Sequence, residues 1–152
     1  SRRQRGGVTI RTDRMMTEQK PETTQGIVMI LDDDRFLADM YSVKFIQKGY
    51  TVEAYQSARD ALTALRGGVK PQGILFDVVM PDQDGFDFMR TLKTEKLTEN
   101  AACIALTNQS SDQDRTKMME LGADAYIVKA SMIPSEVVTA TIAEIGKKKL
   151  TK

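Results

Sequence analysis

The sequence predicts an α/β protein built on a doubly wound parallel sheet. From Ile27 onwards, five short apolar runs alternate with amphipathic stretches, and the alternation continues to the end of the chain. The apolar runs have the length of buried strands, whereas the stretches between them show helical spacing. The loops that connect them are short. Repeats of this kind form a parallel sheet with helices packed on both faces.

The first two repeats begin at Ile27. Residues 27–31 form an apolar run closed by three aspartates, and apolar residues then recur at helical spacing until Gly49. Residues 51–54 form a second, weaker strand. Ser57 can cap the helix that follows, and two successive glycines end that helix.

The third repeat is centred on Asp77. An apolar run from Ile74 ends on this carboxylate, and the Pro-Asp-Gln-Asp-Gly segment of residues 81–85 is a strong turn signal before a helix over residues 86–92. Asp77 should therefore lie at the carboxyl edge of a strand, where open α/β sheets bind ligands. The alternative is an aspartate that only caps the turn.

The fourth and fifth strands are predicted at residues 102–106 and 125–128. A helix opened by Ser111 or Asp112 lies between them and ends at a glycine. Pro134 can start the last helix, which ends in three lysines. Cations at that end are favoured by the helix dipole.

The length of 152 residues suits one folded domain, which we place at residues 27–146. Residues 1–26 lack apolar periodicity, so we expect a disordered or artificially added N-terminal extension, with Met15 or Met16 as the natural start. Residues 147–152 form a basic C-terminal tail, and we expect no output domain after it. No aromatic residue interleaves the arginines of the extension, so nucleic-acid binding is not expected.

The composition excludes several kinds of chemistry. The chain has no histidine, which removes Ser-His-Asp and Cys-His catalysis and histidine-ligated zinc. Its one cysteine, Cys103, lies in an apolar run and is expected to be a buried core residue. No apolar run approaches the ~18 residues of a membrane helix and no secretory signal is present, so we expect a cytoplasmic protein without membrane insertion.

Polar residues follow four of the predicted strands. They are Asp32 with Asp33, Asp77, Thr107 and Lys129, and the parallel arrangement would bring them to one edge of the sheet. Three carboxylates in one pocket repel one another and call for a cation, and oxygen ligands without His or Cys point to Mg²⁺. With that metal, Asp77 can attack a phosphoryl group, and Lys129 and the Thr107 hydroxyl can hold its oxygens.

These residues belong to a wider set of motifs in a fixed order. The motifs are Ile30-Leu31-Asp32-Asp33-Asp34, Leu75-Phe76-Asp77, Met80-Pro81, Asp84-Gly85, Ala105-Leu106-Thr107, Gly122-Ala123-Asp124-Ala125-Tyr126 and Val128-Lys129. Over about residues 27–145, the sequence resembles the receiver domain of two-component response regulators. It is similar in particular to the stand-alone, chemotaxis-type receivers.

The resemblance implies a flavodoxin-like fold with strand order 2-1-3-4-5, and with two helices on one face of the sheet and three on the other. It implies that Asp77 is the phosphoacceptor and that Thr107 and Lys129 assist it. The implied Mg²⁺ ligands are the carboxylates of Asp32, Asp33 and Asp77 and the backbone carbonyl of Val79. Thr107 and Tyr126 would form the switch pair.

The resemblance also implies partners. A histidine kinase or phosphotransfer protein would donate the phosphoryl group, and a downstream protein would bind the face formed by the fourth helix, the last strand and the fifth helix. A homodimer that forms on phosphorylation is a further alternative. The protein would catalyse only its own phosphorylation and dephosphorylation.

Two other functions stay open at this point. Lys129 is followed by Ala130 where the family usually has proline, which predicts a trans peptide bond and a reshaped loop and leaves a phosphorylation-independent binding module as one alternative. The second is a carboxylate-nucleophile phosphohydrolase. Such enzymes usually carry a second acid two residues after the nucleophile, and this chain has Val79 there.

Overall fold

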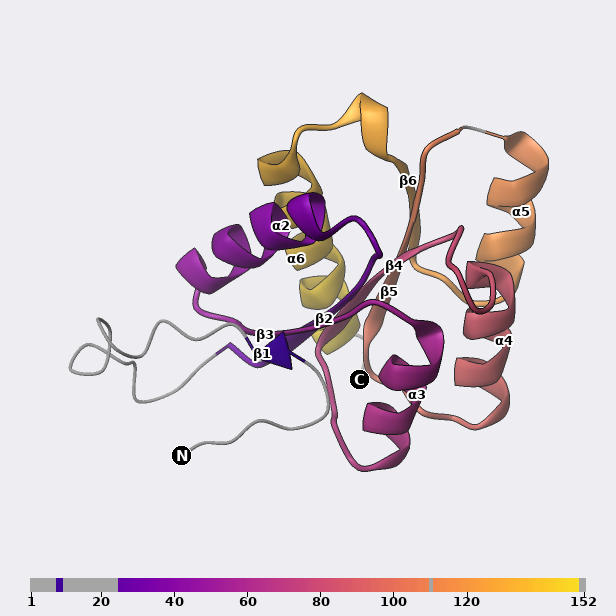
Figure 1. The fold of residues 1–152 in the computed structure, drawn as a ribbon, viewed down its shortest axis with the longest axis horizontal. Helices are drawn as coiled ribbons and strands as arrows, with labels where there is room; N and C mark the ends of the chain where they lie inside the picture. The colour runs from indigo at the N-terminus through magenta and orange to yellow at the C-terminus, as the bar shows by residue number, and fades with distance from the viewer. Residues whose placement is uncertain (1–7, 10–24, 110, 151–152) are drawn as a thin grey trace.

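The computed structural model describes residues 8–9, 25–109 and 111–150, and within them the chain forms a six-stranded sheet in the order β1-β3-β2-β4-β5-β6 (Figure 1). The strands are β1 (Val8–Thr9), β2 (Ile27–Leu31), β3 (Thr51–Tyr55), β4 (Gly73–Asp77), β5 (Ala102–Thr107) and β6 (Ala125–Val128). The strands β3, β2, β4, β5 and β6 are parallel. They are the five predicted strands, and the order 2-1-3-4-5 is confirmed.

Helices cover both faces of this sheet. They are α2 (Arg35–Gln47), α3 (Ala58–Arg66), α4 (Gly85–Thr94), α5 (Asp112–Glu120) and α6 (Pro134–Leu150), with a single 3₁₀ turn, η2 (Lys129–Ser131). In Figure 1, α2 and α6 lie on one side of the sheet and α3, α4 and α5 on the other, as the resemblance implied. None of these helices combines the length and apolar character that a bilayer span requires.

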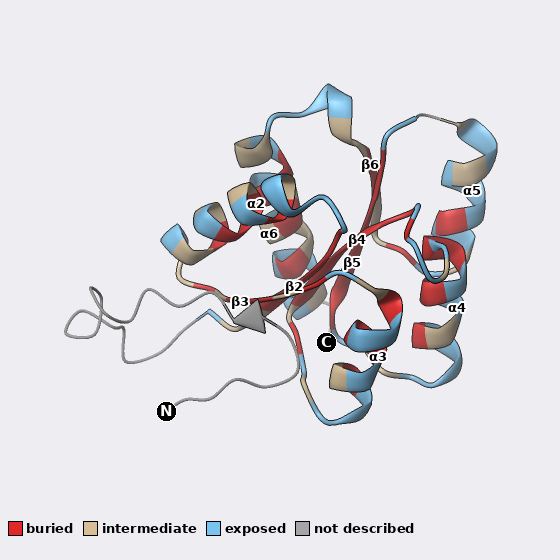
Figure 2. Ribbon diagram, in the orientation of Figure 1, coloured by how far each residue is buried: buried red, intermediate tan, exposed pale blue. Residues whose placement is uncertain are grey.

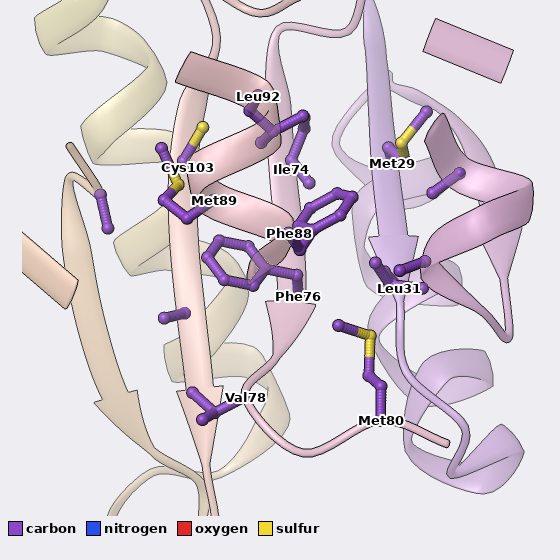
Figure 3. Packing of buried hydrophobic residues seen from close by; sticks show 14 of the residues in the cluster. Met29, Leu31, Ile74, Phe76, Val78, Met80, Phe88, Met89, Leu92 and Cys103 are labelled. Carbon is purple, nitrogen blue, oxygen red and sulfur yellow. The ribbon is translucent and has the colours of Figure 1, made fainter. Parts of the chain in front are cut away.

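Two hydrophobic layers result from the alternation of side chains along the buried strands. Phe76 of β4 points to the side of α3, α4 and α5, where its ring centroid lies 5.3 Å from that of Phe88 (Figure 3). Leu75, its neighbour in sequence, packs on the other side among residues of α2 and α6. Figure 2 shows the central strands buried along their length, which explains why their sequences are continuously apolar.

Polar caps and glycines set the helix ends. The Ser57 and Ser111 hydroxyls accept hydrogen bonds from the first turns of α3 and α5, so Ser111 rather than Asp112 caps α5. Gly49 and Gly122 follow α2 and α5 with φ of +97° and +109°, a conformation in which glycine carries no Cβ penalty. The end signals in the sequence therefore lie where the helices stop.

The ends of the chain differ from expectation where the structure describes them. Within the stretch predicted as a disordered extension, Val8 and Thr9 pair antiparallel with Ala54 and Glu53 of β3; the rest, with Met15 and Met16, lies outside the described residues up to residue 24. The residues assigned to the basic C-terminal tail belong to the last helix as far as Leu150, because α6 continues through them. No glycine or proline lies between Lys147 and Leu150 to stop the helix.

The cysteine has the predicted buried place. Cys103 of β5 is 2% exposed in the layer shared with α3, α4 and α5. Burial raises the pKa of its thiol to about 12. The thiol is therefore held protonated at physiological pH and acts as a core side chain.

Candidate functional site

Three carboxylates meet at the carboxyl ends of β2 and β4. Asp32 directly follows β2 and Asp77 is the last residue of β4, and both are buried, with 1% and 4% exposure. The register that pairs Leu31 with Phe76 brings these two strand ends together. Asp33, exposed in the loop after β2, completes the group: carboxylate oxygens of the three residues lie within 4.8 Å of one another.

A single ammonium group reaches this cluster from β6. Lys129 follows β6 as the first residue of η2, and its Nζ donates a hydrogen bond to Asp77 Oδ2 at 3.2 Å. The same Nζ lies 3.0 Å from Asp32 Oδ2, as an ion pair outside hydrogen-bond geometry. Burial would lower the pKa of Lys129, but Asp32 and then Asp77 raise it above its ordinary value. Lys129 is therefore a fixed positive charge at the site.

The environment of Asp77 disfavours its charge. Burial and the neighbouring Asp32 raise the pKa of Asp77 from 3.8 to about 6, although Lys129 and the Val79 N–H, which donates to Asp77 Oδ1 at 3.4 Å, act in the opposite direction. A partly desolvated carboxylate of this kind is typical of functional sites. At neutral pH Asp77 is ionised, and the neighbouring groups do not fully neutralise its negative charge.

The residues present fit a divalent cation. The donors are all carboxylate oxygens, and Asp32 Oδ2 has no hydrogen-bond partner within the described ranges, whereas Asp32 Oδ1 accepts from the Asp34 N–H at 2.9 Å. A hard ion such as Mg²⁺ prefers such oxygens and would neutralise the excess negative charge. Val79, whose carbonyl is the fourth predicted ligand, lies two residues after the end of β4, and the residue is 68% exposed.

The hydroxyl of Thr107 is held by its own loop. Thr107 ends β5, and its Oγ1 donates to the Gln109 carbonyl at 3.1 Å and accepts from the Gln109 N–H at 3.3 Å. The structure thus places it at the same sheet edge as Asp77, with its hydroxyl bonded to backbone. The residue is 7% exposed.

The Tyr126 ring already lies inside the protein. The residue is 4% exposed, in register with Ala105 of β5, and its hydroxyl has no hydrogen-bond partner in the described part of the chain. An unpaired buried hydroxyl costs about 1–3 kcal/mol. The guanidinium of Arg115 lies over the ring, 4.9 Å from its centroid. The two predicted switch residues, Thr107 and Tyr126, are therefore not hydrogen-bonded to each other.

The structure gives supporting contacts to two residues for which the sequence analysis assigned no individual role. The Asp82 carboxylate accepts the N–H groups of Ala58 and Arg59 at 3.1 and 2.9 Å, which ties the loop after β4 to the start of α3. Burial would raise the pKa of Asp82, but these hydrogen bonds lower it. Gly85 packs so closely on β4 that a Cβ would lie 2.8 Å from Val78 Cα. The Pro-Asp-Gln-Asp-Gly turn signal contained both residues, but not their contacts.

Comparisons with known proteins agree with this architecture. Residues 28–141 match the sequence model of the response regulator receiver domain. The chain is 30% identical over 111 residues to the response regulator SaeR of Staphylococcus aureus, a match that covers 73% of this chain and 46% of SaeR. The chain thus spans about half the length of the curated relatives it matches.

Solved structures show the same likeness. A CheY-like response regulator receiver domain protein from Methanospirillum hungatei superposes with a TM-score of 0.74 at 25% identity, over 83% of this chain and 98% of the other. The BeF3-activated DrrB receiver domain gives a TM-score of 0.67 at 25% identity, over 80% of this chain and 97% of the other. From its sequence, its sheet order and these matches, the chain belongs to the response regulator receiver domain family of two-component systems.

Proposed function

We propose that this chain is a phosphorylation-activated signalling switch whose phosphoacceptor is Asp77. The observation that carries the proposal is the surroundings of Asp77: it is buried at a strand end beside two further carboxylates, and Lys129 Nζ lies 3.2 Å from its Oδ2. A nucleophile, a metal-binding group and a fixed cation then lie in one cluster of side chains. We take the phosphoryl donor to be a histidine kinase or phosphotransfer protein, as membership of the two-component receiver family suggests.

The transfer requires an ionised Asp77. A carboxylate oxygen of Asp77 attacks phosphorus, the bond from phosphorus to the donor's histidine nitrogen breaks, and the imidazole leaves with that electron pair. Lys129 is placed to hold a phosphoryl oxygen once its contact with Asp77 exchanges. Asp32, Asp33, Asp77 and the Val79 carbonyl would hold Mg²⁺, which when bound supplies charge neutralisation for the phosphoryl oxygens.

The signal would pass through Thr107 and Tyr126 to the face formed by α5, β6 and α6. A phosphoryl group adds roughly −1.5 to −2 charges and three acceptor oxygens, enough to draw the Thr107 hydroxyl away from the Gln109 carbonyl. The loop that carries Gln109 leads into α5, so this exchange would move the start of that helix. A downstream protein would recognise the changed face.

The similar proteins support this proposal. SaeR is named a response regulator, and the DrrB receiver domain is described as activated by BeF3. The identity of the kinase and of the downstream protein, a homodimer formed on phosphorylation and a cytoplasmic location stay predictions.

The proposal is tested by intact mass spectrometry of the purified chain with acetyl phosphate and Mg²⁺. We expect one phosphoryl adduct on the wild type, and none on Asp77→Asn or on wild type with the metal chelated. A wild type that takes no adduct from acetyl phosphate or from a competent kinase would contradict the proposal. An adduct that survives in Asp77→Asn would move the phosphoacceptor elsewhere.

A phosphorylation-independent binding module is the second candidate, and one observation favours it: Lys129 is followed by Ala130, where the family usually has proline. A downstream partner that binds wild type and Asp77→Asn with equal affinity, with and without acetyl phosphate, would support this candidate. The phosphohydrolase alternative has less support. An exposed Val79 stands where such an enzyme would need its second acid.

A further inference from the structure

The helix α5 is attached to the domain by unusually few apolar contacts. Of its nine residues only Met118 is buried, and the helix is largely exposed in Figure 2. Two cation–aromatic contacts add to this attachment. Lys117 Nζ lies 4.4 Å from the ring centroid of Phe86 in α4, and the Arg115 guanidinium lies 4.9 Å from that of Tyr126 in β6.

The inward position of Tyr126 is not explained by hydrogen bonding. Its hydroxyl has no partner within the described ranges, and the Thr107 hydroxyl, which could have been one, is bonded to Gln109. The unpaired hydroxyl disfavours burial of the side chain. Packing of the ring and the cation above it must therefore outweigh this cost.

In the described residues, no ion pair competes with the contact between the Arg115 guanidinium and the Tyr126 ring. Among residues 25–109 and 111–150, the structure shows no ion pair for its guanidinium, although α5 carries acidic residues at Asp112, Asp114 and Glu120. A guanidinium over the face of an aromatic ring is attracted by the negative π-face. Because Arg115 belongs to α5 and Tyr126 to β6, the contact joins two elements of the proposed signalling face.

We propose that Arg115 is a positioning residue that holds the Tyr126 ring inward, against the cost of its unpaired hydroxyl. The inference rests on the proposed function only in treating Tyr126 as part of the switch. If phosphorylation of Asp77 favours the inward ring, then by linkage an inward ring favours phosphorylation. Removing the cation would lower both the inward population and the extent of phosphorylation at a given donor concentration.

The orientation of Tyr126 can be measured without any phosphoryl donor. The chain has four tyrosines, so labelling with 3-fluorotyrosine gives four ¹⁹F signals, and Tyr126→Phe identifies the relevant one. Broadening by a soluble gadolinium chelate then reports the exposure of each ring. In Arg115→Gln we expect the ratio of inward to outward Tyr126 to fall roughly two- to fivefold, as for an exposed cation–aromatic contact. Arg115→Lys should restore most of the wild-type signal.

Lys117→Gln is the matched control, because it removes the other cation–aromatic contact of the same helix without touching Tyr126. Its Tyr126 signal should stay as in wild type. An unchanged signal in Arg115→Gln would overturn the proposal. An equal change in Lys117→Gln would also overturn it, since Tyr126 would then respond to any loosening of α5.

The linkage is tested by intact mass across a range of acetyl phosphate concentrations with Mg²⁺. We expect the half-saturating concentration to rise in Arg115→Gln and not in Lys117→Gln. A changed Tyr126 signal with an unchanged half-saturating concentration would overturn the linkage. If wild type takes no phosphoryl group at all, the proposed function fails, whereas the ¹⁹F result still decides whether Arg115 holds the ring.

Discussion

Lys129 Nζ lies 3.2 Å from Asp77 Oδ2, although 52 positions separate the two residues in the sequence. The same ammonium lies 3.0 Å from Asp32 Oδ2, so one cation serves two buried carboxylates. With Asp33 nearby, the cluster retains excess negative charge when all three acids are ionised. Stability should therefore respond in opposite directions to the loss of Lys129 and to the loss of the Asp77 charge.

Replacing Lys129 by methionine should destabilise the protein at neutral pH. The Lys129 side chain is 9% exposed, and its loss would leave Asp32 and Asp77 without a counter-charge, which for buried pairs costs about 3–5 kcal/mol. Urea unfolding with a chelator measures this loss, and added Mg²⁺ should reverse part of it. Lys147→Met is the control: Lys147 pairs with Glu144 but is 70% exposed, so we expect a change within about 0.5 kcal/mol. Equal stability of Lys129→Met and wild type in chelator would contradict the prediction.

Replacing Asp77 by asparagine should stabilise the metal-free protein at neutral pH. Folding raises the pKa of Asp77 from 3.8 to about 6, so its ionisation opposes folding above that pKa. The penalty is about 3 kcal/mol, and because the attraction of Lys129 is already part of this raised pKa, the gain in Asp77→Asn should approach that value.

The stability gained in Asp77→Asn should depend on pH. As the pH falls through about 6 toward 4, the folded wild type takes up the proton and its penalty disappears, so the gain of the variant should vanish there. Urea unfolding at several pH values, with a chelator present, measures the difference in stability between the variant and wild type. A variant that is less stable than wild type at neutral pH, or a gain that persists at acid pH, would show that burial of Asp77 carries no such cost.

Adding a methyl group at Gly85 should disturb the phosphoacceptor strand. A Cβ there would lie 2.8 Å from Val78 Cα and 2.9 Å from the Asp77 carbonyl oxygen, both backbone atoms that cannot rotate away. We expect Gly85→Ala to lower the free energy of unfolding by about 1–3 kcal/mol, as overpacking does, and to reduce adduct formation in the mass assay.

Gly146 of α6 provides the matched control for that substitution. Apart from its chain neighbours and the backbone of its own helix, no atom of the described residues lies within 4 Å of a Cβ at this position, and alanine in a helix is favoured over glycine. Gly146→Ala should therefore stabilise the protein by about 0.5–1 kcal/mol, with normal phosphorylation. If both alanine variants gave the same change in stability, the close contact of Gly85 with β4 would have no energetic consequence.

Neutralising Asp33 should weaken Mg²⁺ binding without unfolding the domain. Asp33 is the exposed member of the carboxylate cluster, so Asp33→Asn should alter stability by less than about 0.5 kcal/mol. Its Mg²⁺ dissociation constant, measured by titration calorimetry, should rise at least about tenfold, since even supporting residues of metal sites commonly contribute that much. Asp39→Asn, an exposed acid on α2, should bind Mg²⁺ as wild type does. Unchanged affinity in Asp33→Asn would remove Asp33 from the metal site.

Apolar periodicity predicted the parallel sheet because its strands are buried on both faces and its helices on one. The position of Asp77 at the end of β4 followed from the turn residues directly after it. The strand β1 could not be predicted in this way. It has two residues, too few for any alternation, and its pairing with Glu53 and Ala54 depends on backbone groups that carry no sequence signal.

The hydrogen bonds and side-chain orientations at the candidate site were harder to predict than its location. Strand ends placed Thr107 and Lys129 near Asp77, but the partner of the Thr107 hydroxyl depends on a rotamer choice worth only about 1 kcal/mol. Tyr126 was expected to be a switch residue, but the sequence did not show that its ring is buried with an unpaired hydroxyl. The contact of Asp82 with the start of α3 spans 24 positions and left no local pattern.

Because Cys103 is buried, the reactivity of its thiol can report unfolding of the surrounding core. Its thiol is 2% exposed with a pKa of about 12, so alkylating reagents, which need an accessible thiolate, cannot react with it until β5 and the helices above it separate. It is the only cysteine in the sequence, so every adduct reports one location. The rate of thiol labelling therefore gives the opening frequency of this half of the core, with no dye or engineered probe. Comparison with and without acetyl phosphate would measure how far phosphorylation at Asp77 restrains that motion.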